Sequence, residues 1–132
     1  MIGIDTNVLV RYITQDDPVQ AALARRFVER TISPERCGHV SLVVLAELVW
    51  VLRTRYGASR DEIASAVEEL LADPRLCVQE EDAVWRAVDE YDLEGVDFAD
   101  ALIAAIDREQ GCTHTVTFDK AALKIAGMTL LQ

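Results

Sequence analysis

The sequence lacks the features typical of membrane and disordered proteins. Its longest apolar stretch, residues 42–52, is interrupted by Glu47 and is shorter than the roughly 20 residues that a membrane-spanning helix needs. The N-terminus has no basic region and reaches an acid at Asp5, so we expect no ordinary signal peptide. There is also no repeat, low-complexity tract or Pro- or Gly-rich linker. We therefore expect a soluble, cytoplasmic chain that forms one domain over residues 1–132.

Cysteine and histidine are scarce, which argues against sulfur- or histidine-based metal sites. Cys37, Cys77 and Cys112 are odd in number and show no C-x-x-C pairing, so neither a disulfide framework nor a thiolate site is supported. We expect three buried free thiols in a reducing cytoplasm. His39 and His114 lack the spacing of zinc ligands and are interpreted as strand residues.

The motifs of several common enzyme classes are also missing. There is no G-x-S-x-G elbow, no Walker loop and no G-x-G-x-x-G. An aspartyl-phosphate phosphatase would need an acid two residues after Asp5, where this chain has Asn7. These absences leave the carboxylates as the main candidates for chemistry.

Basic residues are few, with 13 against 23 acids and a net charge of −10. Such a chain does not attract nucleic acid through its overall field, so any phosphodiester would have to be bound locally, through cations or arginines. Most of the basic residues are arginine, whose planar guanidinium binds phosphate oxygens through two hydrogen bonds, unlike the lysine ammonium. The candidates for phosphate contacts are Arg11, Arg25, Arg26, Arg53 and Arg55. Each of these arginines could instead belong to the solvent-exposed face of a helix.

Short apolar segments alternate with longer amphipathic ones. The pattern predicts strands at residues 2–4, 39–40, 76–78, 114–117 and 128–131, with helices over about 6–12, 18–29, 42–56, 60–72, 81–93, 98–110 and 120–126. We expect an α/β fold with three α/β/α layers, in which helices flank a short, mostly parallel central sheet of about five strands. In such sheets the ligand crevice lies beyond the carboxyl ends of the strands.

Local signals predict where several helices begin and end. Thr6 or Asn7 is expected to cap the first helix, and Ser41 the third, which Gly57 should stop. Ser59 and Glu62 have the spacing of a capping box.

Four acids occupy positions from which they could meet in the crevice. Asp5 directly follows the first strand, Asp119 follows the fourth, and Asp100 lies in the first turn of a helix. Glu47 is surrounded by apolar residues, so we expect it to be buried and to need an Arg or a metal ion beside it.

Structural roles are the alternative for each of these acids. Asp97 and Asp100 have capping-box spacing, and Asp119 or Asp5 could cap the segment that follows it. Glu47 could form a buried ion pair with an Arg. Four converging carboxylates would instead suit Mg²⁺ or Mn²⁺, and such ions can activate water for phosphodiester cleavage.

Four motifs in order resemble the PIN domain, especially the VapC-type toxins of bacterial toxin–antitoxin pairs. They are residues 4–9 (IDTNVL), 46–48 (AEL), 97–105 (DFADALIAA) and 117–120 (TFDK), and the likeness extends to the closing residues 127–130. The resemblance implies an endoribonuclease that hydrolyses RNA with Mg²⁺ or Mn²⁺.

The resemblance also assigns roles to individual residues. It implies that the catalytic and metal-binding acids are Asp5, Glu47, Asp100 and Asp119. It gives supporting roles to Thr6, Asn7, Asp97 and Thr117.

The resemblance further implies protein partners. Such toxins are neutralised by a small antitoxin and commonly form homodimers, or toxin–antitoxin hetero-oligomers. Trp50, Val51 and Tyr56 could form an apolar patch for such contacts, although they could equally belong to the core. The alternatives to a ribonuclease are a non-catalytic module that binds a basic partner in an acidic groove, and a related metal-dependent DNA nuclease or phosphatase.

Overall fold

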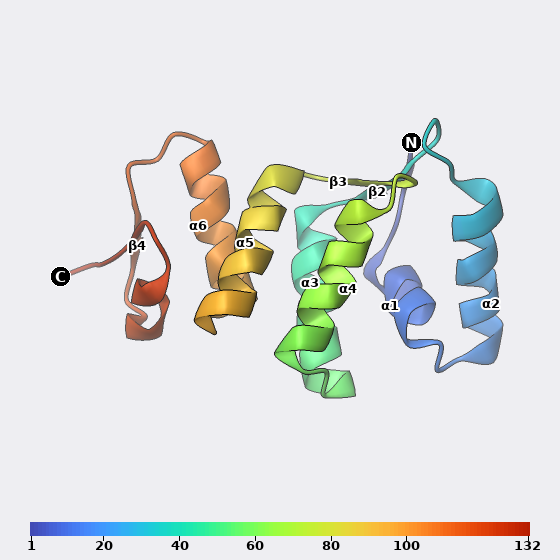
Figure 1. Ribbon diagram of the computed structural model, residues 1–132, viewed down its shortest axis with the longest axis horizontal. Coiled ribbons are helices and arrows are strands. Elements are labelled where there is room, and N and C mark those ends of the chain that lie inside the picture. The colour runs from blue at the N-terminus through green and yellow to red at the C-terminus, as the bar shows by residue number, and fades with distance from the viewer. The chain divides into compact units, whose positions relative to one another are not determined.

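The computed structural model describes residues 1–132, which form two compact units, Met1–Gln79 and Glu80–Gln132 (Figure 1). They are called the N-terminal unit and the C-terminal unit below. Both units combine short parallel strands with helices, which confirms the α/β class. None of the helices has the length and apolar character needed to cross a lipid bilayer.

The N-terminal unit contains a three-stranded parallel sheet and most of the helices. Its elements are β1 (Ile2–Gly3), α1 (Thr6–Thr14), α2 (Pro18–Arg26), a π-helical turn (Phe27–Thr31), β2 (Gly38–Val40), α3 (Leu42–Tyr56), α4 (Arg60–Ala72) and β3 (Leu76–Val78). The strand order is β1-β2-β3, with Ile2 opposite Gly38 and Gly38 opposite Leu76. Parallel strands place their carboxyl ends at one edge, so α1 and α3 both begin at that edge.

The C-terminal unit contains two long helices and a two-stranded parallel sheet. Its elements are α5 (Glu81–Glu94), α6 (Phe98–Glu109), β4 (Thr115–Thr117), a 3-10 helix (Lys120–Lys124) and β5 (Met128–Leu130). The rings of Tyr91 and Phe98 meet edge to face, with centroids 5.9 Å apart, where α5 packs on α6. The predicted five strands are therefore present and every pair is parallel, with three strands in one unit and two in the other.

Several helix ends follow the local chemistry of the sequence. Ser59 and Glu62 form the predicted capping box, and Gly57 ends α3 in the left-handed region with φ 61°. The prediction that Thr6 or Asn7 caps the first helix is wrong. The cap is Asp5, whose carboxylate accepts a hydrogen bond from the Thr6 N–H, so Thr6 is already the first residue of the helix.

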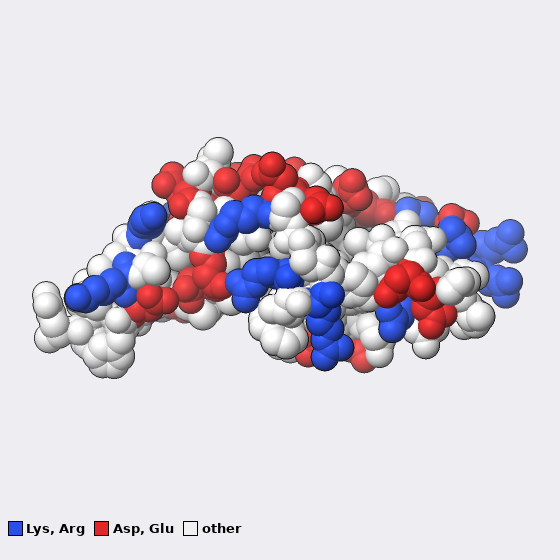
Figure 2. Space-filling view, turned by 90° about the horizontal axis from the view of Figure 1, so that it is seen from below, with Lys and Arg blue, Asp and Glu red and all other residues white.

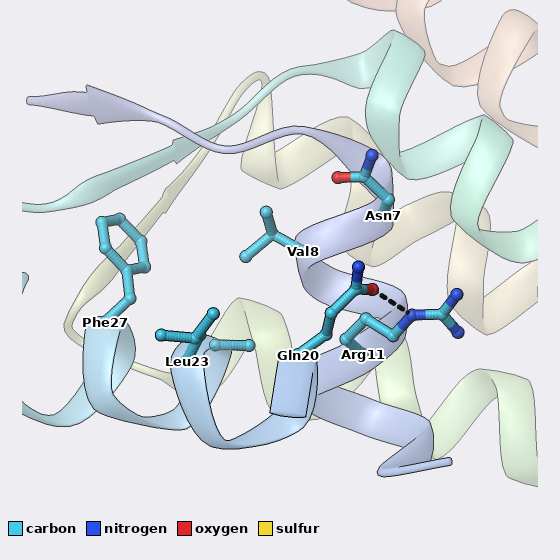
Figure 3. Close-up of a pocket in the computed structure, with 7 residues that line it drawn as sticks. Asn7, Val8, Arg11, Gln20, Leu23 and Phe27 are labelled. Atoms are coloured by element: carbon cyan, nitrogen blue, oxygen red, sulfur yellow. Dashed lines mark hydrogen bonds between the residues drawn. The ribbon is translucent and has the colours of Figure 1, made fainter. Parts of the chain in front are cut away.

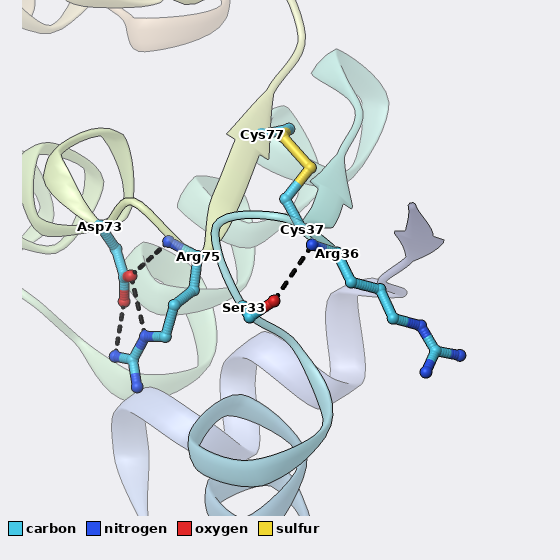
Figure 4. Close-up of a disulfide and its surroundings, with 6 residues drawn as sticks. All are labelled: Ser33, Arg36, Cys37, Asp73, Arg75 and Cys77. Atoms are coloured by element: carbon cyan, nitrogen blue, oxygen red, sulfur yellow. Dashed lines mark hydrogen bonds and ion pairs between the residues drawn. A yellow bond between two sulfur atoms is a disulfide. The ribbon is translucent and has the colours of Figure 1, made fainter.

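The expectation of three buried free thiols is also wrong. Cys37 and Cys77 form a disulfide, with their Cα atoms 5.9 Å apart (Figure 4). Cys112 is free but exposed. Cys37 immediately precedes β2 and Cys77 lies in the neighbouring strand β3. Strand pairing thus joins two cysteines that are 40 residues apart in the sequence, which their spacing alone could not indicate.

Candidate active site

The parallel sheet of the N-terminal unit brings Asp5 and the helix that carries Glu47 to the same edge. Asp5 follows β1 and caps α1, while Ser41 follows β2 and caps α3. The start of α3 is also tied to the end of β3, because the Gln79 Oε1 atom accepts a hydrogen bond of 3.0 Å from the Leu42 N–H. The acid-bearing helix is therefore anchored to two strands of the sheet.

Thr6 connects the two acids of this unit. Its backbone N–H donates to the Asp5 Oδ1 atom at 2.7 Å, and its side-chain hydroxyl donates to the Glu47 Oε1 atom. Thr6 is buried, with 5% of its surface exposed, and it is the only polar residue in the buried core. A buried, fixed donor of this kind orients the carboxylate that it holds.

The expectation that Glu47 is buried is wrong. The residue is exposed, because α3 turns this side of its second turn toward a cleft although its sequence is apolar nearly all round. The alternative of a buried ion pair with Arg has no support either, since the hydrogen-bond partner of Glu47 is the Thr6 hydroxyl. Burial therefore does not explain the acid, and the structural contact of its carboxylate is the hydrogen bond that it accepts from the buried Thr6 hydroxyl.

Asp5 and Glu47 line one cleft of about 330 Å³. The other side chains that face it include Trp50 and Arg55 from α3, and Arg11 from α1. Asn7, at the start of α1, lines this cleft and also a second one of about 310 Å³ between α1 and α2, where the Arg11 Nε donates to the Gln20 Oε1 atom at 2.8 Å (Figure 3). The volume of the first cleft is within the range of small-ligand sites.

The C-terminal unit holds a second group of acids. The Asp97 Oδ1 atom accepts a hydrogen bond from the Asp100 N–H at 3.1 Å, so Asp97 caps α6 and Asp100 lies in the first turn. Asp119 follows β4 and caps the 3-10 helix through the Ala121 N–H at 2.9 Å. The Thr117 hydroxyl oxygen accepts from the Asp119 N–H at 3.0 Å, which holds the turn that carries this acid.

The electrostatics of this group favour a bound cation. The pKa of Asp100 is raised by partial burial of its carboxyl and then by the negative charges of Asp97 and Asp119. Carboxylates that repel one another in this way are stabilised in their charged form by a nearby cation. Their oxygens are the donors that hard divalent ions prefer, so the side chains present fit such an ion chemically.

The eight predicted site residues thus fall into two groups. Asp5, Thr6, Asn7 and Glu47 line one cleft of the N-terminal unit. Asp97, Asp100, Thr117 and Asp119 lie together at the start of α6 and the end of β4. No three His, Cys, Asp or Glu side chains form a ready-made metal-binding cluster, so the joining of both groups around an ion stays a prediction.

The hydrogen bond between Thr6 and Glu47 was not predicted from the sequence. The residues lie 41 positions apart, and the sequence predicted Thr6 as a helix cap and as a supporting site residue without indicating which acid it contacts. Trp50 and Arg55 are both exposed and line this cleft. The sequence predicted Trp50 only as part of an apolar patch, and Arg55 only as one of several candidate phosphate contacts. Their common cleft with Asp5 depends on how α1 packs on α3.

On the face drawn in Figure 2, Lys and Arg side chains lie among Asp and Glu side chains. Attraction of a phosphodiester by this face would therefore be local, as the net charge of −10 already indicated.

Comparison with protein-family models gives a match over most of the chain. The family model of the PIN domain matches residues 2–128, and so extends over both units. No protein among those with curated functions matches the chain.

Proposed function

Because this chain belongs to the PIN-domain family, whose members are generally metal-dependent nucleases, we propose that it is an endoribonuclease and the toxin of a toxin–antitoxin pair of the VapC type. The observation that carries this proposal is the pairing of acids in both units. Asp5 and Glu47 share a cleft, and Asp100 is electrostatically coupled to Asp119. The family match covers both pairs.

Asp5, Glu47, Asp100 and Asp119 are the proposed ligands of Mg²⁺ or Mn²⁺. Such an ion activates water and offsets the charge of the phosphodiester under attack. Thr6 holds the Glu47 carboxylate, Thr117 holds the turn before Asp119, and Asp97 holds the first turn of α6. These supporting groups keep the acids in one orientation, which reduces the cost of assembling the site.

The proposed role includes partners. The proposed substrate is RNA, the proposed location is the cytoplasm, and the proposed inhibitor is a small antitoxin protein that covers the acidic cleft. A homodimer or a toxin–antitoxin hetero-oligomer is the proposed assembly. The excess of acids over basic residues, 23 against 13, supports a basic or arginine-bearing antitoxin segment.

RNA cleavage tests the proposal directly. Wild-type protein is expected to cleave single-stranded or looped RNA in the presence of Mg²⁺ or Mn²⁺. Cleavage should stop when EDTA is added, because EDTA removes the ion. Asp5→Asn is expected to remove the activity while it keeps the cap of α1, because Asn is also a good N-cap. Glu29→Gln, at an exposed acid outside the cleft, is the matched control and should cleave like wild type.

The same assay separates the alternatives. Cleavage of single-stranded DNA in preference to RNA would identify a DNA nuclease, and release of phosphate from a simple phosphomonoester would identify a phosphatase. No cleavage with any ion, or equal cleavage by wild type and Asp5→Asn, would rule out the proposed ribonuclease. Antitoxin binding that survives a Glu47→Ala and Asp100→Ala double substitution, without any nuclease activity to lose, would favour a binding module.

Thr6→Val is expected to reduce RNA cleavage by about 10- to 100-fold, the usual effect of losing a group that orients a metal ligand. The substitution removes the hydroxyl that donates to Glu47, yet the exposed carboxylate can be solvated, so folding should be little affected. The measurement is kcat and KM with RNA, beside a thermal unfolding curve. The loss should be in kcat, and Thr6→Ser should restore most of it; an unchanged kcat in Thr6→Val would show that the hydrogen bond has no role.

A further inference from the structure

The cleft beside Asp5 and Glu47 contains more than acids. Trp50 follows Glu47 by one helical turn and is 51% exposed, although an indole ring is normally well buried. Arg55 lies eight residues after Glu47 on the same helix and lines the same cleft. At 1.5 Å per residue, Arg55 is about 12 Å along the helix from Glu47, so its charge belongs to a different part of the cleft from the acids.

Two other polar side chains that line this cleft, Arg11 and Tyr56, already have partners within the protein. The Tyr56 hydroxyl donates to the Asp16 Oδ2 atom at 2.7 Å and accepts from the Arg11 Nη1 atom at 3.1 Å. Arg11 also forms an ion pair with Asp16 at 3.0 Å. Arg11 and Tyr56 are therefore occupied by intramolecular partners.

Arg55, in contrast, is exposed and takes part in no hydrogen bond or ion pair within the protein. It is the cation of this cleft that can bind a ligand without giving up a partner. Val51 lies between Trp50 and Arg55 around the helix and lines the same cleft, so one apolar side chain separates the ring from the guanidinium.

We propose that this cleft is a subsite for one nucleotide of single-stranded RNA, in which the base stacks on Trp50, the sugar lies against Val51 and a phosphate binds Arg55. The inference rests on the proposed ribonuclease function and deepens it. An exposed aromatic ring next to an unpaired arginine is the combination by which proteins bind single strands without reading their sequence. A base that is stacked in a duplex could not reach the ring, so the subsite selects unpaired RNA.

Charge and position favour a nucleotide over a protein partner. The guanidinium complements a phosphate, and the subsite adjoins the two carboxylates that are proposed to act on the phosphodiester. A strand that lies from Arg55 toward Asp5 would pass Glu47 on its way. The subsite would therefore hold the RNA on one side of the bond to be cut.

Binding is tested apart from cleavage with a single-stranded oligouridylate in EDTA. In a Trp85→Phe background Trp50 is the only tryptophan, because the chain has two, and its fluorescence is expected to be quenched as the oligonucleotide binds. Trp50→Ala should weaken binding about tenfold, within the effect of losing one stacked base, and Trp50→Phe should retain most of the affinity.

Salt dependence tests the arginine. Arg55→Gln is expected to reduce the slope of log affinity against log salt by about 0.7, the contribution of one phosphate contact to a single strand. Arg36→Gln is the matched control, since Arg36 is also exposed and lies outside this cleft, near the disulfide (Figure 4). The control should leave the slope unchanged.

The outcomes separate this inference from the function on which it rests. Quenching and the Trp50→Ala loss without cleavage under any metal condition would support the subsite and contradict the nuclease. Cleavage with unchanged affinity in Trp50→Ala and Arg55→Gln would overturn the subsite and leave the nuclease intact. Sedimentation that shows Trp50→Ala converting a dimer to a monomer, with RNA affinity unchanged, would overturn it in favour of a contact between two copies.

Discussion

Asp100→Asn is expected to lower RNA cleavage by at least about 100-fold, because it removes a charged oxygen from the proposed ion site, and such ions contribute several kcal/mol to the transition state. The amide is nearly the same size as the carboxyl, so α6 should keep its first turn. Loss of activity would then reflect chemistry and not unfolding. The measurement is the single-turnover cleavage rate at saturating Mg²⁺ or Mn²⁺.

The same substitution is expected to make the metal-free protein more stable at neutral pH. Burial and the charges of Asp97 and Asp119 raise the pKa of Asp100, which means that its charged form is disfavoured in the folded state. The cost is fully present above the raised pKa and disappears below the unfolded value of about 3.9, where the carboxyl is neutral in both states. The helix N-terminus favours the charge and offsets part of this cost, but the raised pKa shows that the repulsion and burial are larger.

Urea unfolding in EDTA at pH 7 and near pH 3.5 measures this effect. The free energy of unfolding of Asp100→Asn should exceed that of wild type at pH 7, and the difference should shrink at the lower pH. Added Mn²⁺ should stabilise wild type more than the variant, since an ion stabilises only a protein that binds it. Asp89→Asn makes the same charge change at an exposed site on α5 and is the control. A variant that is as active as wild type, or less stable at pH 7, would contradict the proposed role of Asp100.

Reduction of the disulfide is expected to lower the free energy of unfolding by about 2–4 kcal/mol. The bond closes a loop of 40 residues that contains β2, α3 and α4, so its loss mainly increases the freedom of the unfolded chain. In a reducing compartment the protein would rely on its core and strand pairing alone, which is a large change for a domain of ordinary stability.

Unfolding curves with and without reductant give this difference. A Cys37→Ala and Cys77→Ala double variant should match the reduced wild type, and neither should respond further to reductant. Cys112→Ala is the control, because that thiol is exposed and unpaired, and it should unfold like wild type. Identical curves for oxidised and reduced protein, or two alkylatable thiols at positions 37 and 77 without reductant, would contradict the pairing.

The positions of the helices and of the candidate acids were predictable from the sequence because their signals are local. Ser59 with Glu62, Gly57 and Asp97 act within one helical turn of the ends that they determine. Asp5 and Asp119 each lie two residues after the end of their strand, so the rule that parallel sheets bind ligands beyond their carboxyl ends was enough to select them. The four motifs that resemble the family are each a short run of residues, so they could be recognised in the sequence without the tertiary structure.

Only the tertiary structure decided which distant residues meet. The pairing of β2 with β3 joins Cys37 to Cys77, and the packing of α1 on α3 places the Thr6 hydroxyl on Glu47. The same packing exposes Glu47, which its apolar neighbours in the sequence had suggested was buried. Trp50 and Arg55 likewise became a candidate subsite only through the cleft that they share with Asp5. Such contacts depend on how whole elements pack, and no periodicity or spacing within one element carries that information.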